Sequence, residues 1–264
     1  MSPKNLDCDF VYPDSEICIQ PALQHAKLKC CGIAPEVFGE YVDITHYAME
    51  TMMAAKRGGA SINGSVHVSQ FFDQRSPIRL GETVKLIGKV TQVEDAPKGR
   101  LVTSRFEVVR PGGDTALVLE RISLRVDPEK AAVKPQTRDI SQSLRPEELT
   151  LLSQHPLAPE KVAEYSAEGE NLIHSDPEVA RQFGFRAPIA AGLMAVRLMM
   201  AHLWSAGTVE SLRMTVNFRR PMFWDDALAL YGAGKANEHL LIMRTGDGKI
   251  ANESHVDAVA YRPV

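Results

Sequence analysis

The feature that most constrains the fold of this 264-residue chain is an internal repeat. Residues 75–88 align with residues 219–232 without a gap. Both segments read Arg, any residue, Pro and an apolar residue, followed by a Gly or Asp turn, an acid, and alternating apolar residues that end in Gly. The Pro and the turn residue are typical of the corner between two strands, and the alternation is typical of half-buried strands. The repeat therefore predicts two similar units in one chain.

Each repeat belongs to a helix candidate followed by a series of β-like runs. We expect helices over residues 48–55 and 192–204, and the second is predicted to be buried because it is apolar on nearly all sides. The expected strands cover residues 66–72, 84–93, 101–109 and 116–126 in the first half, and 212–218, 228–231, 240–244 and 256–261 in the second. This pattern predicts an α+β fold of two tandem units, each with one helix packed on an antiparallel sheet.

The boundary between the units is expected in a Pro-rich, charged segment. Residues 127–160 are predicted to form this linker, with a short helix at 146–153. The units then cover residues 1–126 and 161–264. Such units are long enough to bury a hydrophobic core each.

Composition limits the partners and the compartment. The net charge is −3 with both signs interspersed, which predicts neither a nucleic-acid nor a membrane partner. No apolar run approaches the about 20 residues that span a bilayer. All four cysteines lie in the first 31 residues without metal-binding or redox spacing. Reduced thiols predict a cytoplasmic location, and the chain lacks the phosphate-loop, dinucleotide, nucleophile-elbow and zinc-protease motifs.

The chemically richest segment is 165–194. It places Glu168, Glu170, Asn171 and His174 within a few residues of one another, ahead of an apolar helix that begins at Gly192. Acids and a His beside a helix N-terminus are suited to acid–base chemistry, because the backbone N–H groups there can hold an oxyanion. The alternative is that the His is a packed residue and that the polar residues after it only start a helix.

This segment resembles the signature of the MaoC-like, or hydratase 2, family of (R)-specific enoyl-CoA hydratases and 3-hydroxyacyl-thioester dehydratases. The matching positions are Tyr165, Asn171, Ile173, His174, Asp176, Pro177, Ala180, Gly184, Pro188, Ile189 and Gly192. Residues 217–221 also resemble the family strand beside the phosphopantetheine arm. The resemblance implies two hot-dog units, in which a central helix is wrapped by an antiparallel sheet. It further implies that only the second unit carries a site, that the substrate is an acyl-CoA or carrier thioester, and that no cofactor or metal is needed.

The resemblance also implies roles for individual residues. His174 and a carboxylate would hold the reacting water, Asn171 would order the loop, and the N–H of Gly192, next to Ala191, would bind the thioester carbonyl. Two arginines are candidates for binding the CoA phosphates, since guanidinium pairs with phosphate in a two-pronged geometry; the alternative is that they lie on solvated faces. These two are Arg197 and Arg220.

The chain departs from the family pattern at the carboxylate. Counting back from His174, the family Asp position falls on Gly169. Deleting one spacer residue instead brings Glu170 to that position, and Glu168 is a third option. The sequence therefore leaves three hypotheses open: a hydratase or dehydratase, a hot-dog thioesterase, and a non-catalytic acyl-CoA binder. A homodimer is compatible with each of them, and the acyl chain length stays open.

Overall fold

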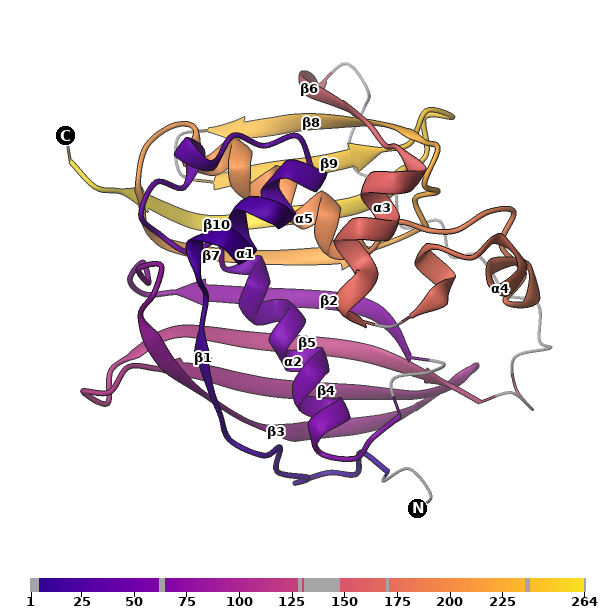
Figure 1. Cartoon of the computed structure of the whole chain (residues 1–264), viewed down its shortest axis with the longest axis horizontal. Helices are drawn as coiled ribbons and strands as arrows, with labels where there is room; N and C mark the ends of the chain where they lie inside the picture. Colours follow the sequence, from indigo (N-terminus) through magenta and orange to yellow (C-terminus); the bar gives the residue numbers. More distant parts are fainter. Residues whose placement is uncertain are drawn as a thin grey trace.

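One antiparallel sheet runs through the whole molecule, which is described by a computed structural model over residues 5–61, 65–127, 130, 148–169, 171–235 and 238–263. In this part of the chain the ten strands follow the order β1-β3-β4-β5-β2-β7-β10-β9-β8-β6 (Figure 1). The strands are β1 (Ser15–Cys18), β2 (Ser65–Gln74), β3 (Thr83–Ala96), β4 (Gly99–Val109), β5 (Thr115–Val126), β6 (Thr150–Pro156), β7 (Val209–Phe218), β8 (Ala227–Lys235), β9 (Glu238–Arg244) and β10 (Ile250–Tyr261). The α-helices are α1 (Pro21–Cys30), α2 (Thr45–Arg57), α3 (Pro159–Ser166), α4 (Pro177–Gln182) and α5 (Gly192–Trp204).

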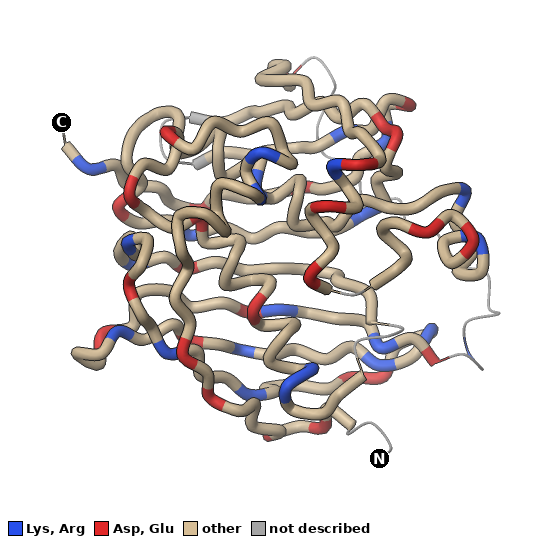
Figure 2. Tube along the Cα trace, in the orientation of Figure 1, with Lys and Arg blue, Asp and Glu red and all other residues tan. Residues whose placement is uncertain are grey.

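The sheet divides into two halves of the same design. β1 to β5 form one half, β6 to β10 form the other, and each half has one long helix, α2 or α5, on the same face of the sheet (Figure 1). All eight strands and both helices that the sequence predicts are present. Charged residues of both signs are interspersed along the trace of both halves (Figure 2). The predicted α+β class, with a helix on an antiparallel sheet in each half, is confirmed.

The halves meet at a junction with local two-fold symmetry. The offset of 144 residues that places Arg75 on Arg219 also places Phe71 on Thr215. Phe71 and Thr215 lie directly opposite each other where β2 pairs with β7. A residue that faces its own counterpart marks a pseudo-two-fold axis between two antiparallel strands. The repeat in the sequence is therefore a symmetry of the sheet.

Helix α5 is the most buried element. Eleven of its residues are buried, because its side chains are apolar on nearly all sides and other elements cover it. α1 and α3 contact each other on this side of the sheet (Figure 1). In the described part of the chain, no helix is both long enough and apolar enough to cross a membrane.

The predicted linker differs from the expectation in its second part. Residues 150–156 form strand β6, which pairs with β8, so the helix predicted over 146–153 is wrong where the structure describes it. Leu151 and Leu152 extend into the sheet because β8 offers an unpaired strand edge to them. Residues 131–147 of this segment lie outside the described residues, and the exact unit boundaries stay a prediction.

Candidate active site

His174 is held in one orientation by the backbone. It ends the short 3₁₀ helix η4 (Leu172–His174), and its Nδ1 lies 2.7 Å from the carbonyl oxygen of Ile189. A carbonyl only accepts hydrogen bonds, so Nδ1 carries the proton and donates it, and Nε2 keeps its lone pair. Burial lowers the pKa of His174, and the hydrogen bond to Ile189 offsets this only in part. The ring is therefore a neutral imidazole with one basic nitrogen, the form that a general base needs.

The loop around His174 is fixed by side-chain contacts to the backbone. Asn171 is exposed, and its Oδ1 accepts a hydrogen bond from the N–H of Ile173 at 3.3 Å. Asp176 accepts hydrogen bonds from the N–H groups of Glu178 at 2.8 Å and Val179 at 3.2 Å, which caps α4. The residues after the His thus start a helix, as the alternative interpretation holds. Those before it shape the loop that presents the ring.

Gly192 opens α5 where no side chain caps the helix. Ala191 is the N-cap residue and makes no side-chain cap hydrogen bond. The first N–H groups of an α-helix have no acceptor within the helix, so they are free to hold an oxygen atom of a ligand. A Cβ atom at position 192 would lie 2.6 Å from the ring of Phe218, which is closer than real contacts allow. Only glycine therefore fits between this ring and the open end of the helix.

The His ring and the helix start are linked by a short piece of backbone. Ile189, which accepts the hydrogen bond of His174, lies three residues before Gly192. Three residues span at most about 10 Å. Ala190 fixes this piece by donating its N–H to the carbonyl of Met222 at 2.7 Å. The structure thus brings His174, Ala191 and Gly192 together.

The proposed acid–base chemistry needs a carboxylate beside His174, and the described residues do not supply one. Glu170 lies outside the described residues. Glu168 is half-exposed and forms an ion pair of 3.2 Å with Lys27. Among the described residues no carboxylate pairs with His174. Gly169 is buried, yet no described atom lies within 4 Å of a Cβ built on it, so this position has room for a side chain.

Arg220 lies beside an open cavity next to this site. The cavity has a volume of about 400 Å³ and also exposes Arg186, Phe223 and Lys249. Phe223 pairs with Ile189 in an isolated bridge, which places the cavity beside the residue that holds the His174 ring. Asp226 and Asp247 line it as well, so the three cations are suited to binding phosphate groups there in competition with these two carboxylates.

Arg197 neither lies on a solvated face nor is free to bind a CoA phosphate, the two alternatives that the sequence offers. Its side chain is 2% exposed, and its Nε lies 2.7 Å from Oδ2 of Asp43. It also donates hydrogen bonds to Oγ1 of Thr45 at 3.0 and 2.8 Å. An inward position on the apolar helix α5 excludes solvent, and the carboxylate of Asp43 offsets the cost of burying this guanidinium. Arg197 therefore joins the two halves and is not a candidate for binding CoA.

Two residues important for the later argument are absent from the sequence-based predictions. Asp43 has no local signal, because its partner Arg197 lies in the other half. Arg121 does have a local signal in the sequence. It follows Leu117 and Leu119 at a spacing of two in a predicted strand, which places it on the face that packs against the helix. A charged residue on the buried face of a strand is a signal that alternation alone can detect.

Known proteins support the fold and the resemblance. No protein-family model matches the chain. The 3-hydroxyacyl-thioester dehydratase X of Mycobacterium tuberculosis is 27% identical over 180 residues, which span 64% of this chain and 60% of that protein. The crystal structure of HtdX from Mycobacterium tuberculosis superimposes with a TM-score of 0.74 at 22% identity, over 92% of this chain and 98% of that one.

A MaoC-like dehydratase from Phytophthora capsici superimposes with a TM-score of 0.73 at 15% identity, over 98% of both chains. At this identity the superposition shows the fold, which covers both halves and the junction between them. The chain thus shares the fold of MaoC-like dehydratases over nearly its whole length, and the resemblance that the segment 165–194 predicts is confirmed.

Proposed function

We propose that this protein adds water to a 2-enoyl thioester to give a 3-hydroxyacyl thioester, or catalyses the reverse dehydration. The observation that carries the proposal is the neutral His174 ring, held by Ile189 beside the uncapped start of α5. The similarity to a 3-hydroxyacyl-thioester dehydratase supports the same reaction. No cofactor is needed, because the reaction adds or removes the elements of water.

Each group has a defined role in the proposed reaction. The water oxygen attacks C3 of the enoyl chain while Nε2 of His174 takes one of its protons. Electron density moves to the thioester oxygen, and the N–H of Gly192 stabilises the resulting enolate. The proton now held by Nε2 of His174 is then delivered to C2 as the enolate returns to the thioester, so that H and OH have been added across the double bond and the imidazole is neutral again. In this proposal Glu170 is the carboxylate that holds the water together with His174.

The CoA part of the substrate fits the neighbouring cavity. Arg220, Arg186 and Lys249 offer positive charge to its phosphates there, although Arg186 already pairs with Asp225 and Asp226 and Lys249 with Asp247. Arg220 is exposed and forms no ion pair within the described part of the chain, so we propose that it makes the main phosphate contact. The acyl part then passes Ala191 and Gly192 into the sheet-covered interior.

The direct test measures the enoyl-thioester absorbance of crotonyl-CoA and longer enoyl-CoAs after addition of purified protein. We expect the absorbance to fall and the thioester to stay intact. Absence of turnover with every chain, at enzyme concentrations far above trace, contradicts the proposal. Release of free CoA, detected with a thiol reagent, would instead identify a thioesterase.

The second candidate is a non-catalytic acyl-thioester binder. Gly169 at the family Asp position favours it, because no described carboxylate faces His174. Glu170→Gln distinguishes the two candidates, with Glu168→Gln as the matched control whose partner is Lys27. If Glu170 serves in catalysis, only Glu170→Gln lowers turnover, by about 10²-fold or more. If the protein is a non-catalytic binder, neither variant changes turnover. Gly169→Asp, for which there is room, then introduces activity.

Two properties of the whole protein complete the proposal. We expect a cytoplasmic enzyme, as the sequence suggests, and a homodimer is compatible with the proposed function. Light scattering of the purified chain measures its mass in solution, and a mass of 29.1 kDa would exclude the homodimer.

A further inference from the structure

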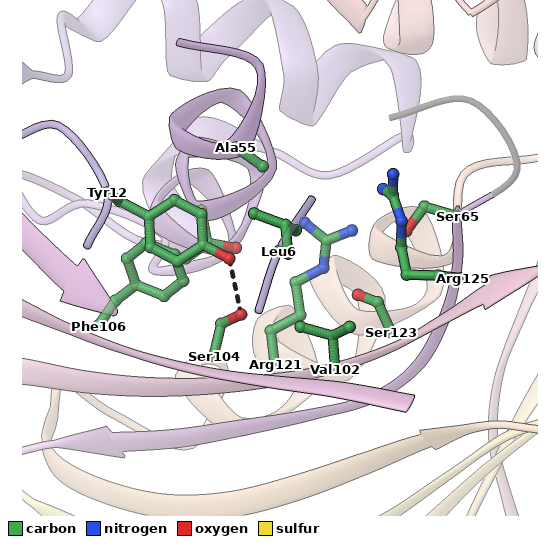
Figure 3. Close-up of a pocket in the computed structure, with 11 residues that line it drawn as sticks. Leu6, Tyr12, Ala55, Ser65, Val102, Ser104, Phe106, Arg121, Ser123 and Arg125 are labelled. Carbon is green, nitrogen blue, oxygen red and sulfur yellow. Dashed lines mark hydrogen bonds between the residues drawn. The ribbon is translucent and has the colours of Figure 1, made fainter. Parts of the chain in front are cut away.

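The half without His174 contains a pocket with an unusual lining. It lies where α2 covers β4 and β5, and it is lined by the side chains of Tyr12, Ser104, Arg121, Ser123 and Arg125, among others (Figure 3). The same face of β5 begins with the buried residues Leu117 and Leu119 and then becomes polar. A core face that changes from apolar to cationic along one strand is not explained by packing.

Arg121 is the central residue of this pocket. Its side chain points from β5 toward α2, into the space between the other labelled residues (Figure 3). It is 9% exposed, and its Nε atom has no hydrogen-bond partner. Within the described ranges no carboxylate pairs with it, whereas the other buried arginine, Arg197, has Asp43. Burial lowers the pKa of Arg121 to about 10, so the group still carries its charge at neutral pH.

The residues around Arg121 add hydrogen-bond donors and further positive charge. Ser104 faces Arg121 across the β4–β5 ladder, and its Oγ lies 2.8 Å from the hydroxyl of Tyr12. Arg125 lines the same pocket, and its charge is one cause of the lowered pKa of Arg121. A buried guanidinium without an anion is costly, and a second cation increases the cost. The lining is thus complementary to an anion that the described part of the chain does not supply.

A line of side chains connects this pocket with the start of α5. The ring of Phe218, which bounds Gly192, lies 4.3 Å from the ring of His67, centroid to centroid. His67 in turn faces Ser123, a residue of the pocket. Strands β5, β2 and β7 are consecutive in the sheet, so two spacings of about 4.8 Å separate the strand of Arg121 from the strand below Gly192. An acyl chain of moderate length spans this distance.

We propose that the pocket at Arg121 binds a carboxylate at the far end of the acyl chain, so that the substrate is the thioester of a dicarboxylic acid. This inference rests on the proposed function for the position of the thioester. Arg121 forms the charged contact, with Ser104 and Ser123 as hydrogen-bond donors. A free carboxylate in solution offers the same chemistry, and the experiments separate the two sources.

The kinetic test compares two enoyl-CoAs of equal chain length, one ending in a methyl group and one in a carboxylate. We expect wild-type kcat/KM to favour the carboxylate. Arg121→Gln lowers this preference by about 10- to 100-fold, the effect of losing a charged hydrogen bond. The matched control is Arg105→Gln, because Arg105 is exposed on the same sheet and, among the described residues, forms an ion pair with Glu107 alone. An equal preference in wild type and Arg121→Gln overturns the inference.

A binding test keeps the inference independent of turnover. Calorimetry measures the affinity of saturated acyl-CoAs that end in a carboxylate or a methyl group, and of a free dicarboxylate. Tighter binding of the carboxylate-ended CoA, lost in Arg121→Gln, supports the inference even if no enoyl-CoA reacts. Binding of the free dicarboxylate alone, with equal affinity for both CoAs, overturns the substrate assignment. If Arg121→Gln does not fold, Ser104→Ala replaces it, and an unchanged preference in that variant counts against the pocket.

Discussion

The starts of the two central helices show how one design serves two purposes. At α2, the carboxylate of Asp43 accepts hydrogen bonds from the N–H of Thr45 at 3.0 Å and from its hydroxyl at 2.7 Å, and it also pairs with Arg197. At α5, the N-cap residue Ala191 offers no such group. The first helix start is therefore satisfied within the protein, whereas the second leaves donors for a ligand. The half that keeps its helix start open is the half that carries His174.

The strand faces that pack under the two helices also differ, but here the first half has the pocket and the second half is packed. The repeat places Gln70 on Met214, and these residues face Arg121 and Val256 on the neighbouring strands. Val256 is 2% exposed and packs in the core, whereas its counterpart Arg121 lines a pocket. After duplication, each half is thus free to specialise: the second for chemistry at its helix start, and the first for recognition of the substrate.

Replacing His174 tests the catalytic role of the second half and is expected to have the largest effect, a loss of kcat/KM. His174→Ala removes the only group proposed to take the water proton, so kcat/KM should fall by about 10²- to 10⁴-fold. Steady-state hydration of crotonyl-CoA measures the loss. His202→Ala is the control, because His202 is an exposed residue near the end of α5, away from the helix start at Gly192. Equal rates for His174→Ala and wild type would show that His174 of the second half does not take part in catalysis.

Breaking the buried ion pair between Asp43 and Arg197 should have the next largest effect, a loss of unfolding free energy. Asp43→Ala leaves Arg197 buried without its partner, which costs about 3–5 kcal/mol of unfolding free energy. Urea unfolding measures the difference. Glu40→Ala serves as the control, because its ion pair with Arg79 is exposed and contributes at most about 1 kcal/mol. A loss for Asp43→Ala no larger than for the control would show that the pair does not join the halves.

Giving α5 a side-chain cap should separate stability from activity. Ala191→Asp places a carboxylate at the N-cap, and such caps stabilise by about 1 kcal/mol. The same carboxylate competes with the thioester oxygen for the N–H groups, so we expect a higher melting temperature and at least tenfold lower kcat/KM. Thermal unfolding and initial rates on one preparation measure both. A variant that is more stable and fully active contradicts a role for the helix start.

The smallest expected effect is the pH dependence of His174. Because burial lowers its pKa below the ordinary value of about 6.5, the ring is already neutral at pH 7. kcat/KM should therefore be constant above pH 7 and fall as the pH decreases through the lowered pKa. A profile from pH 4.5 to 8.5 measures the midpoint. A midpoint above 7 would instead indicate an imidazolium stabilised by a carboxylate, and would favour Glu170 beside the ring.

The sequence predicts those parts of the fold whose signal is local. The apolar run opened by Gly192 gives the bounds of α5 as residues 192–204, and alternation gives eight of the strands. α1 is missed because it is polar: its buried Gln24 and Lys27 are satisfied by the carbonyls of Tyr41 and Tyr165, which lie far away in the sequence. Partners at such distances leave no periodic pattern.

The same limit applies to the site. The motif finds His174, Asn171 and Gly192 because they are close in sequence to one helix start. It assigns Arg197 to solvent or phosphate, since only the folded chain shows Asp43 beside it. The orientation of the His ring likewise depends on the carbonyl of Ile189, and a backbone atom carries no sequence signal.

The symmetric junction has a consequence for pieces of the chain. β2 and β7 shield each other's edges, so a fragment containing one half would expose a strand of ten residues with unpaired backbone groups. Because Phe71 faces the residue that is its own counterpart, two copies of such a fragment would meet in the same register. Each half thus retains the contact geometry of a homodimer, which the continuous chain satisfies internally.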